Sequence, residues 1–518
     1  MGDGREPTKK PSLRRALFWA LAGTVLVVLV VGVHDTLRPR TPVLAPLGLD
    51  FRAFYCAGEA AAEGADPYRL EPLRACEHRV QPDPLFVPLM VTPAPFPGYT
   101  IAVFETFSRL PYGAAKALWQ LIMVASLFFA ASLLADATGI SAVTLLLALT
   151  TVDGVESWLD GQMAPLSVAA LCAAGACVAL GRHAWAAVAA AVALIEPHLA
   201  VPSVVALFIW LPRTRLVLLA AAAFLAVCSV VAIGAQTNVE YFSTALPRHA
   251  LAEVWANDQY SLTWVAHLAG ASDGLALRIG AISYIAMCAI GVAIAKPLAT
   301  ALATDELLVF FPAAAALLGG SFIHDSQMCA ALPAAFVLAA RARRLYGVAW
   351  LALTLLVVPP MTWWRSHIIG PITVTMVSLA AILALAWKAL EAKPIAARFA
   401  AALAWTLAVT SAAALLAFAI HRLPNPPAPS SVHLAYPSAT LQNDAFASDN
   451  WAVTIKMGME RSPASNLKLV LRKSPVWIGL TLVVIVGCAQ LRPLALRTGL
   501  EATSKQVSVP TPTSVAVG

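Results

Sequence analysis

The acidic and histidine side chains of this chain gather at the ends of apolar runs rather than inside them. Asp50 follows the first apolar run closely. Glu196 and His198 lie between two apolar runs, and His324 with Asp325 precedes another. A carboxylate held at such a place can act as a general base, taking a proton from a hydroxyl whose oxygen attacks an electrophilic carbon. Asp is also a favoured helix N-cap, so a structural role for Asp50 stays open.

The elements that must position these side chains are apolar helices. Of the 518 residues, 59% are hydrophobic and only 12% are charged, whereas about 25% are charged in soluble domains. The run at 16–33 approaches the length of about 20 apolar residues that a membrane-spanning helix needs. A β-barrel would instead alternate polar and apolar residues. The sequence therefore predicts an all-α, polytopic transmembrane helical bundle with about 12–14 membrane segments.

The remaining apolar runs have clear boundaries along the chain. They lie at 114–135, 140–152, 163–181, 184–195, 199–211, 216–235, 274–295, 305–320, 327–340, 345–361, 370–387, 398–420 and 475–491. Three of them, 140–152, 184–195 and 199–211, are short for a clean span. Short or broken helices are tolerated where protein or a water-filled cavity covers their backbone. These runs therefore favour a protein with an internal cavity.

The basic residues predict how the bundle is oriented. If each run crosses once, the basic clusters near 182, 213, 296, 341–344, 388–398 and 492–497 share a side with the basic N-terminus. Because Lys and Arg gather on the cytoplasmic side, we expect both termini in the cytoplasm and a bacterial-type plasma membrane as the location. These clusters account for the net charge of +7, so nucleic acid is not expected as a partner.

The same alternation divides the chain into regions. The segment 34–112 becomes a long first extracytoplasmic loop, with a short surface helix expected from Ala53 to Glu63. Cys56 and Cys76 share this loop, where a disulfide would contribute about 3 kcal/mol, although a free pair stays open. We expect a basic cytoplasmic tail at 1–15, a transmembrane domain at 16–420, an extracytoplasmic loop or small subdomain at 421–474, a last transmembrane helix at 475–491 and a disordered cytoplasmic tail at 492–518.

Several motifs follow one another along residues 15–400. The opening loop carries Asp50-Phe51, Tyr55 and the run GADPY at 64–68, and a Pro-rich run begins at 84. Asp160-Gly161-Gln162, then Asn257, Gln259 and Ser261 in ANDQYS, and GGSFIHDSQ at 319–327 come later. In this order the motifs resemble those of glycosyltransferase family 87, the polyprenol-phosphate-mannose-dependent α-mannosyltransferases, in which the Pro-rich run is similar to the re-entrant stretch and Asp160-Gly161-Gln162 to the Gly-Gln motif.

The resemblance implies a GT-C type fold and an inverting transfer of a sugar from a polyprenyl-phosphate carrier, with Asp50 as the general base. Mannose is the expected sugar, and the acceptor is a glycan or glycolipid reached among the membrane lipids. The phosphate leaves as an anion, so cations are expected near the outer interface. The candidate cations are Arg52, His198, Arg248, His249 and Arg365, and the other candidate contacts are Tyr55, Gln162, Glu196, Asn257, His324 and Asp325.

One position departs from the family pattern. Where the family commonly carries Lys-Pro, this chain has Glu196, Pro197 and His198. A carboxylate would repel a donor phosphate. Either His198 takes over the phosphate contact, or Glu196 binds acceptor hydroxyls, or the donor differs. Three structural alternatives stay open. They are an ion pair between Glu196 and a nearby Arg, a helix cap at His324-Asp325, and anchoring of the segment around Arg365 in the membrane.

Other function classes stay open. A transporter or flippase for a lipid-linked or polar solute would share the helices, and a catalytically inert family member would share the motifs. A transporter is expected to carry functional charges near the bilayer midplane, whereas the acids here lie at the ends of runs, which favours the enzyme. No cofactor is expected. Metal dependence is undecided, and the lack of a compact carboxylate motif favours a metal-free site.

Overall fold

The chain is helical throughout the part that the structure describes. The computed structural model describes residues 12–37, 49–80, 91–154, 160–256, 259–357, 371–422, 444–457 and 463–491. Within these ranges there is no sheet, and only two isolated β-bridges occur, one between Arg69 and Phe446 and one between Gln259 and His324. The all-α expectation is therefore confirmed for the described residues.

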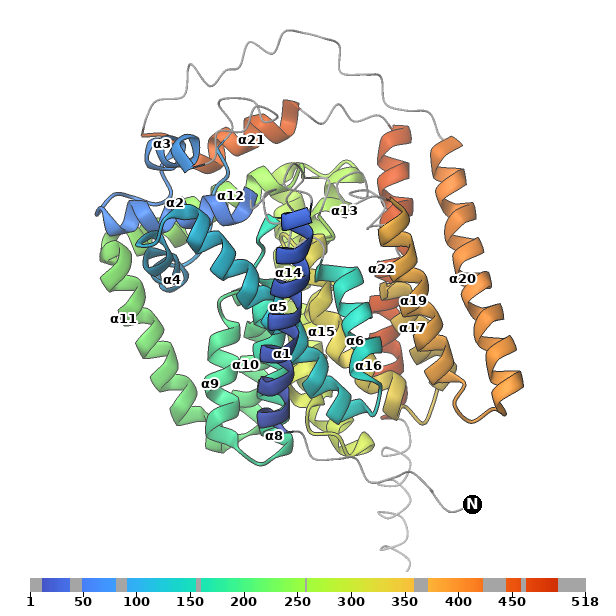
Figure 1. The fold of residues 1–518 in the computed structure, drawn as a ribbon. Coiled ribbons are helices and arrows are strands. Elements are labelled where there is room, and N and C mark those ends of the chain that lie inside the picture. Colours follow the sequence, from blue (N-terminus) through green and yellow to red (C-terminus); the bar gives the residue numbers. More distant parts are fainter. Residues whose placement is uncertain are drawn as a thin grey trace, which may run out of the picture.

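Most helices run lengthwise in one bundle (Figure 1). They are α1 (Leu13–Leu37), α5 (Tyr112–Thr138), α6 (Ala142–Leu149), α8 (Ala164–Ala179), α9 (His183–Ala193), α10 (Pro197–Trp210), α11 (Arg215–Glu240), α14 (Asp273–Leu302), α15 (Leu307–Ala316), α16 (Leu332–Arg341), α17 (Tyr346–Val357), α19 (Pro371–Ala389), α20 (Ile395–Arg422) and α22 (Pro463–Ala489). Short turns connect some of them, namely η1 (Thr150–Gly154), η2 (Pro212–Thr214), η3 (Tyr241–Ala245), η4 (Asp325–Ala331) and the short helix α13 (Leu262–Leu268).

Five helices of the described part are long and apolar enough to cross a membrane. Their spans are Tyr112–Thr138, Pro212–Glu253, Asp273–Leu302, Ile395–Ile420 and Asn466–Ala489. Other apolar helices, such as α9 and α10, have only 10–17 residues. A multi-pass membrane protein is plausible from the five long helices, because each exceeds the thickness of the hydrocarbon core at about 1.5 Å per residue.

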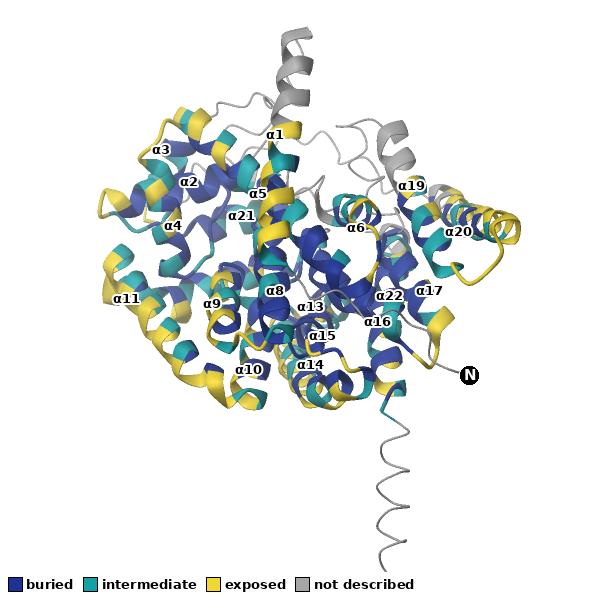
Figure 2. Ribbon diagram, turned by 60° about the horizontal axis from the view of Figure 1, so that its bottom comes forward, coloured by how far each residue is buried: buried dark blue, intermediate teal, exposed yellow. Residues whose placement is uncertain are grey.

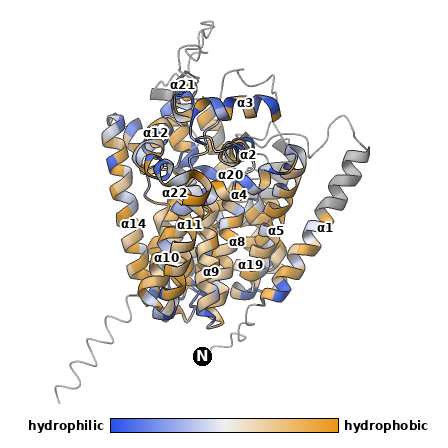
Figure 3. Cartoon of the chain, turned by 90° about the vertical axis from the view of Figure 1, so that its left-hand side faces the viewer, coloured by the Kyte–Doolittle hydropathy of each residue, from blue (hydrophilic) through white to orange (hydrophobic). Residues whose placement is uncertain are grey.

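A second group of helices lies across one end of the bundle and is called the cap here. The cap consists of α2 (Leu49–Ala62), α3 (Leu70–Val80), α4 (Gly98–Ser108), α12 (Leu246–Glu253) and α21 (Ala447–Met457). Its helices carry more hydrophilic residues than the bundle below them (Figure 3). Much of the expected first extracytoplasmic loop is therefore folded helix that packs onto the bundle.

At the end of the bundle opposite the cap, an ion pair and hydrogen bonds connect several helix ends. The alternation of apolar runs predicts that these helix ends lie on one side of the membrane. Arg15 forms an ion pair with Asp136 at the end of α5. Arg341 at the end of α16 donates to the carbonyl of Ala137 at 2.9 Å. Gln490, just after α22, accepts from the amide of Arg343 at 3.1 Å. These contacts tie the start of α1 to the ends of α5, α16 and α22.

The central helices of the bundle are the most buried, and the outer helices are more exposed (Figure 2). The central helices α8 and α15 are buried along nearly their whole length, and their close approach depends on Gly175, where a Cβ atom would lie 2.6 Å from the Phe310 ring. The outer helix α11 instead exposes large apolar side chains such as Phe224 and Val231. Exposed apolar faces of this extent suit contact with lipid rather than water.

Two expectations about boundaries need correction. The helix expected on the surface from Ala53 to Glu63 begins by Leu49 and is largely buried, because α3 and α4 pack around it. A Cβ atom at Gly58 would lie 2.2 Å from the backbone of Phe104 in α4, so the two helices touch through backbone. The last helix begins at Pro463 rather than near 475.

Candidate active site

Asp50 lies in the first turn of α2 and is partly buried. A carboxylate in the first turn of a helix is stabilised by the backbone amides and the helix dipole. The next residue, Phe51, anchors this turn because its ring contacts the rings of Tyr112 and Trp119 in α5, with centroids 6.0 and 5.9 Å away. These contacts fix the carboxylate at the junction of the cap and the bundle.

The Asp160-Gly161-Gln162 segment meets Asp50 directly. The side-chain amide Nε2 of Gln162 donates a hydrogen bond to Oδ2 of Asp50. Gly161 has a φ of +83°, and a Cβ atom there would lie 2.6 Å from Cβ of Phe51. Its carbonyl accepts a hydrogen bond from Nε1 of Trp119 at 2.7 Å. Only glycine permits this turn and this approach, and the approach brings the Gln162 amide to the carboxylate.

A buried ion pair involves Arg52, two residues after Asp50 in α2. Arg52 Nη2 lies 3.0 Å from Glu77 Oε2, and both side chains are almost fully buried. Glu77 also accepts from the amide of Thr92 at 3.2 Å. Burial raises the pKa of Glu77 to about 8, although Arg52 and the Thr92 amide lower it, and nearby Asp50 raises it further. The charge of Arg52 is therefore directed at a carboxylate within the protein.

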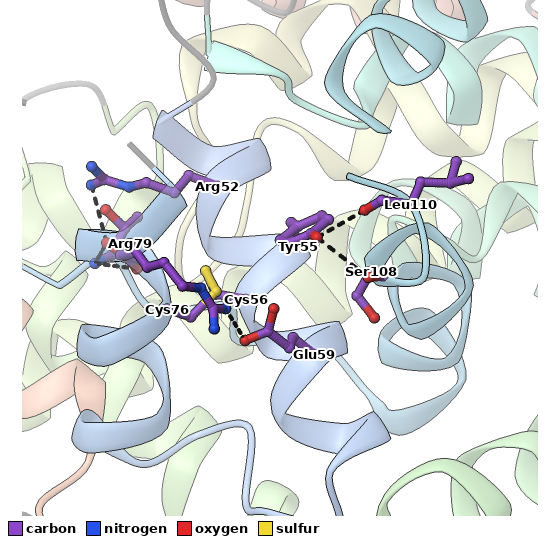
Figure 4. The surroundings of a disulfide bond; sticks show 10 residues. Arg52, Tyr55, Cys56, Glu59, Cys76, Arg79, Ser108 and Leu110 are labelled. Atoms are coloured by element: carbon purple, nitrogen blue, oxygen red, sulfur yellow. Dashed lines mark hydrogen bonds and ion pairs between the residues drawn. A yellow bond between two sulfur atoms is a disulfide. The ribbon is translucent and has the colours of Figure 1, made fainter. Parts of the chain in front are cut away.

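A disulfide fixes this pair of helices. Cys56 of α2 and Cys76 of α3 are bonded, with their Cα atoms 5.6 Å apart (Figure 4). Cys76 directly precedes Glu77, and Cys56 lies one helical turn after Arg52, so the bond holds α3 in the register that the ion pair needs. The pairing left open by the sequence is thus present in the structure.

The hydroxyl of Tyr55 lies at the end of α4. It donates to the carbonyl of Leu110 at 2.9 Å and lies 3.3 Å from that of Ser108, where α4 ends (Figure 4). Burial raises the pKa of Tyr55, and the Glu59 carboxylate adds to the shift. A hydroxyl engaged with two backbone carbonyls serves the packing of α2 on α4.

Glu196 occupies the break between α9 and α10 and is buried, 1% exposed. Its Oε2 atom lies 3.4 Å from Nε2 of Gln327 and 3.6 Å from Nε2 of His198. Within the described part of the chain, Glu196 therefore contacts a histidine and an amide. The preceding residue, Ile195, packs in the same apolar cluster as Phe51, which brings the break close to the Asp50 turn.

A further buried carboxylate, Glu253, was not singled out from the sequence. It accepts from Gln259 Nε2 at 2.8 Å and from Trp451 Nε1 at 2.6 Å. His249 and His324 each place Nε2 at 3.7 Å from one of its oxygens. Glu253 therefore links the cap helices α12 and α21 to the turn before η4. The spacing of His249 and Glu253, four residues apart on one helical face, was the signal available in the sequence.

Other candidates serve local structure or lie elsewhere. His324 is the N-cap of η4, and its amide donates to Oε1 of Gln327 at 2.9 Å in a capping box, as the capping alternative expects. Asp325 accepts from the amide of Ser326 at 3.1 Å. Arg248 is half-exposed at the edge of the cap, where it pairs with Asp449 at 2.7 Å and lies over the Phe446 ring. Two further candidates fall outside the described residues, namely Asn257 and Arg365.

The described residues contain no group of three or more His, Cys, Asp or Glu side chains arranged to hold a metal ion. Asp50 contacts Gln162, and the buried Glu196 and Glu253 each lie beside histidine and amide side chains. Comparison of the chain with protein-family models, with curated proteins and with solved structures finds no match. The resemblance to glycosyltransferase family 87 therefore stands on the quoted motifs alone.

Proposed function

We propose that this protein is a GT-C type membrane glycosyltransferase whose active site lies between the cap and the bundle. It transfers a sugar, with mannose expected, from a polyprenyl-phosphate carrier to a glycan or glycolipid acceptor on the extracytoplasmic side. The observation that carries the proposal is the contact between Asp50 and Gln162, because it joins two motifs of the resemblance that lie far apart in the sequence.

The chemistry follows from the position of the carboxylate. Asp50 accepts the proton of the acceptor hydroxyl while the hydroxyl oxygen attacks the anomeric carbon from the face opposite the phosphate. The donating amide of Gln162 fixes the rotamer of Asp50, which keeps the base aligned with the attacking oxygen. Inversion at the anomeric carbon is the consequence of a single displacement.

The apolar surface of the bundle supports a lipid-linked donor. A polyprenyl chain is delivered within the membrane, so the enzyme needs helices long enough to span it, and five are present. The headgroup must meet a polar site at the membrane surface, where the hydrophilic cap lies on the bundle. Under this proposal the cap faces the extracytoplasmic side, in keeping with the positive-inside rule.

The test is transfer of radiolabel from polyprenyl-phosphate-mannose by membranes that contain the wild type or Asp50→Asn at matched protein levels. We expect transfer by the wild type and a loss of at least about a hundredfold in the variant, the usual contribution of a general base. Full transfer by a folded Asp50→Asn protein would remove Asp50 as the base. No transfer by the wild type from any polyprenyl-phosphate sugar would refute the function.

One observation favours a carrier as the second candidate. Glu196 is a buried acid at the break between two short helices, and transporters bind ions and substrates at such breaks. A carrier would move a fluorescent lipid-linked sugar across proteoliposome membranes, and Glu196→Gln would slow that movement. Transfer chemistry without such movement decides for the enzyme.

A further inference from the structure

The segment 444–457, which contains α21, belongs to the region 421–474 that the sequence predicted as an extracytoplasmic loop or small subdomain. The proposed function leaves this segment without a role. In Figure 1 it lies across the cap, where α21 packs mainly against α12. Two side chains of α12, those of His249 and Glu253, are only 5% and 2% exposed. The segment therefore covers a helix that carries two buried titratable groups.

Trp451 of α21 contacts Glu253 directly. Its Nε1 atom donates to Oε1 of Glu253 at 2.6 Å, and the same oxygen lies 3.7 Å from Nε2 of His249. The other oxygen of Glu253 accepts from Nε2 of Gln259, just before α13, at 2.8 Å. One donor to the carboxylate thus comes from the segment 444–457, and displacement of the segment would withdraw it.

One polar atom beside Glu253 lacks a hydrogen bond. Nδ1 of His249 is buried, and it has no hydrogen-bond partner among the described residues. Buried polar atoms in native proteins are almost always hydrogen-bonded, so an exception calls for an explanation. The His249 ring also lies beside Phe322, with the ring centroids 5.6 Å apart. A polar ligand against this ring would supply the missing partner, but side chains exposed as little as those of His249 and Glu253 meet a ligand only after local opening.

The segment is attached to the cap at Phe446, the residue before α21. Phe446 is 5% exposed, and the guanidinium carbons of Arg69 and Arg248 lie 4.1 and 4.9 Å from the centroid of its ring. The backbone of Phe446 forms a β-bridge with Arg69. Arg248 also pairs with Asp449 of α21 at 2.7 Å. These contacts around the Phe446 ring are called the latch here.

The kinds of contact at the segment suit a part that opens. Among its described side chains, only Phe446, Ala447 and Ile455 are buried and apolar. The Arg248 and Asp449 side chains of the latch are 46% and 31% exposed, and exposed ion pairs are exchanged for water at little net cost. Regions with few buried apolar contacts open at a lower free energy than the core. A disulfide and a large apolar cluster hold α2 and α3 instead, so we expect the segment to open before those helices do.

We propose that the segment 444–457 is a lid that docks over Glu253 and His249 through the latch and lifts to admit a hydroxyl-bearing ligand. Lifting withdraws the Trp451 indole from Oε1 of Glu253, and a ligand hydroxyl replaces it as the donor. A hydroxyl also bonds to Nδ1 of His249, since a hydroxyl both donates and accepts. The inference does not depend on which reaction the protein carries out.

The test measures how fast diethyl pyrocarbonate modifies His249 in the purified full-length protein, by mass spectrometry of its peptides. The exposed His78 of α3 is the internal reference. Phe446→Ala removes the ring of the latch, so it should speed the modification of His249 at least about tenfold and leave that of His78 unchanged. Phe242→Ala removes a ring that is 65% exposed on η3, and this matched control keeps the wild-type rate.

The opposite perturbation holds the lid closed. Arg248→Cys combined with Asp449→Cys places two thiols where the ion pair lies, and a short bismaleimide joins them. Modification of a protected residue follows the population of the open form. Crosslinking should therefore slow the modification of His249 at least about tenfold, relative to the same double variant before crosslinking. The two single-cysteine variants, treated identically, control for reaction at the other cysteines.

The outcomes separate the lid from the proposed function. A Phe446→Ala protein whose His249 reacts as slowly as that of the wild type overturns the lid, and so does a crosslinked protein whose His249 reacts at the uncrosslinked rate. If Phe446→Ala does not fold, as judged by its unfolding midpoint, Arg248→Gln replaces it with an expected increase of about threefold. If the wild type transfers no sugar but crosslinking protects His249, the lid stands and the transferase proposal fails.

Discussion

Replacement of Gln162 tests the geometry of the proposed base most directly. In the structure the Gln162 amide donates to the Asp50 carboxylate across 112 positions of sequence. Gln162→Met keeps the length and approximate volume of the side chain but removes the donor. Asp50 then keeps its place in the first turn of α2 while losing the bond that fixes its rotamer.

The expected magnitude follows from the kind of bond that is lost. A hydrogen bond to a charged group contributes about 1.5–3 kcal/mol, and each 1.4 kcal/mol corresponds to a factor of about ten. We therefore expect the kcat/KM for sugar transfer to fall about tenfold to a hundredfold in Gln162→Met. Gln162→Glu should fall further, because a second carboxylate beside Asp50 disfavours the ionised base and moves the acid limb of the pH–rate profile to higher pH.

The assay is the same radiolabel transfer, run at matched protein levels across pH 5 to 9. Gln236→Met is the control, since Gln236 is exposed on α11. A Gln162→Met protein that transfers sugar as fast as the wild type would refute the reasoning that this amide aligns the base. An unchanged acid limb in Gln162→Glu would show that residue 162 does not act through the base.

Three further predictions concern the frame around the site. Cys56→Ser should lower the free energy of unfolding by about 3 kcal/mol, as the chain-entropy model gives for a sequence separation of 20; equal unfolding midpoints for variant and wild type would contradict this. Because burial raises the pKa of Glu77 to about 8, the folded state holds a proton that the unfolded state has released above its ordinary pKa of 4.5, so stability should decrease as pH rises from about 4.5 to 8. Thermal unfolding should show this slope weakened in Glu77→Gln, and an identical slope would exclude Glu77 as its source. Gly161→Ala should destabilise the protein and reduce sugar transfer. Gly113→Ala should do neither, because the space around its Cβ position is open. Equal stability and transfer in the two variants would show that the close approach at Gly161 is not needed.

Much of the helical framework follows from the sequence alone. The runs predicted at 184–195 and 199–211 correspond to α9 and α10, with the break at Glu196 in the expected place. The predicted end of the 216–235 run coincides with a kink at Gly234, where φ is +76°. These features are local, because apolar run length, proline and glycine act within a few residues of themselves.

The partners of the site residues were decided only by the tertiary structure. The sequence indicated Asp50 and Gln162 separately, but their contact depends on the packing of Phe51 against α5 and on the turn at Gly161. The contact of Arg52 with Glu77 was likewise not indicated by the sequence. Contacts across a hundred residues follow from how helix faces pack together, and a single sequence does not specify that packing.

The burial of α2 shows the same limit. Its pattern of apolar and polar residues predicts a helix at the surface, where one face meets water. In the structure α3 and α4 cover it from further sides, the disulfide holds α3 in place, and Gly58 lets α4 approach to backbone contact. The sequence thus determined which segments are helical and which are apolar enough for a membrane. Tertiary packing decided which side chains meet, because burial in a bundle depends on all neighbouring helices at once.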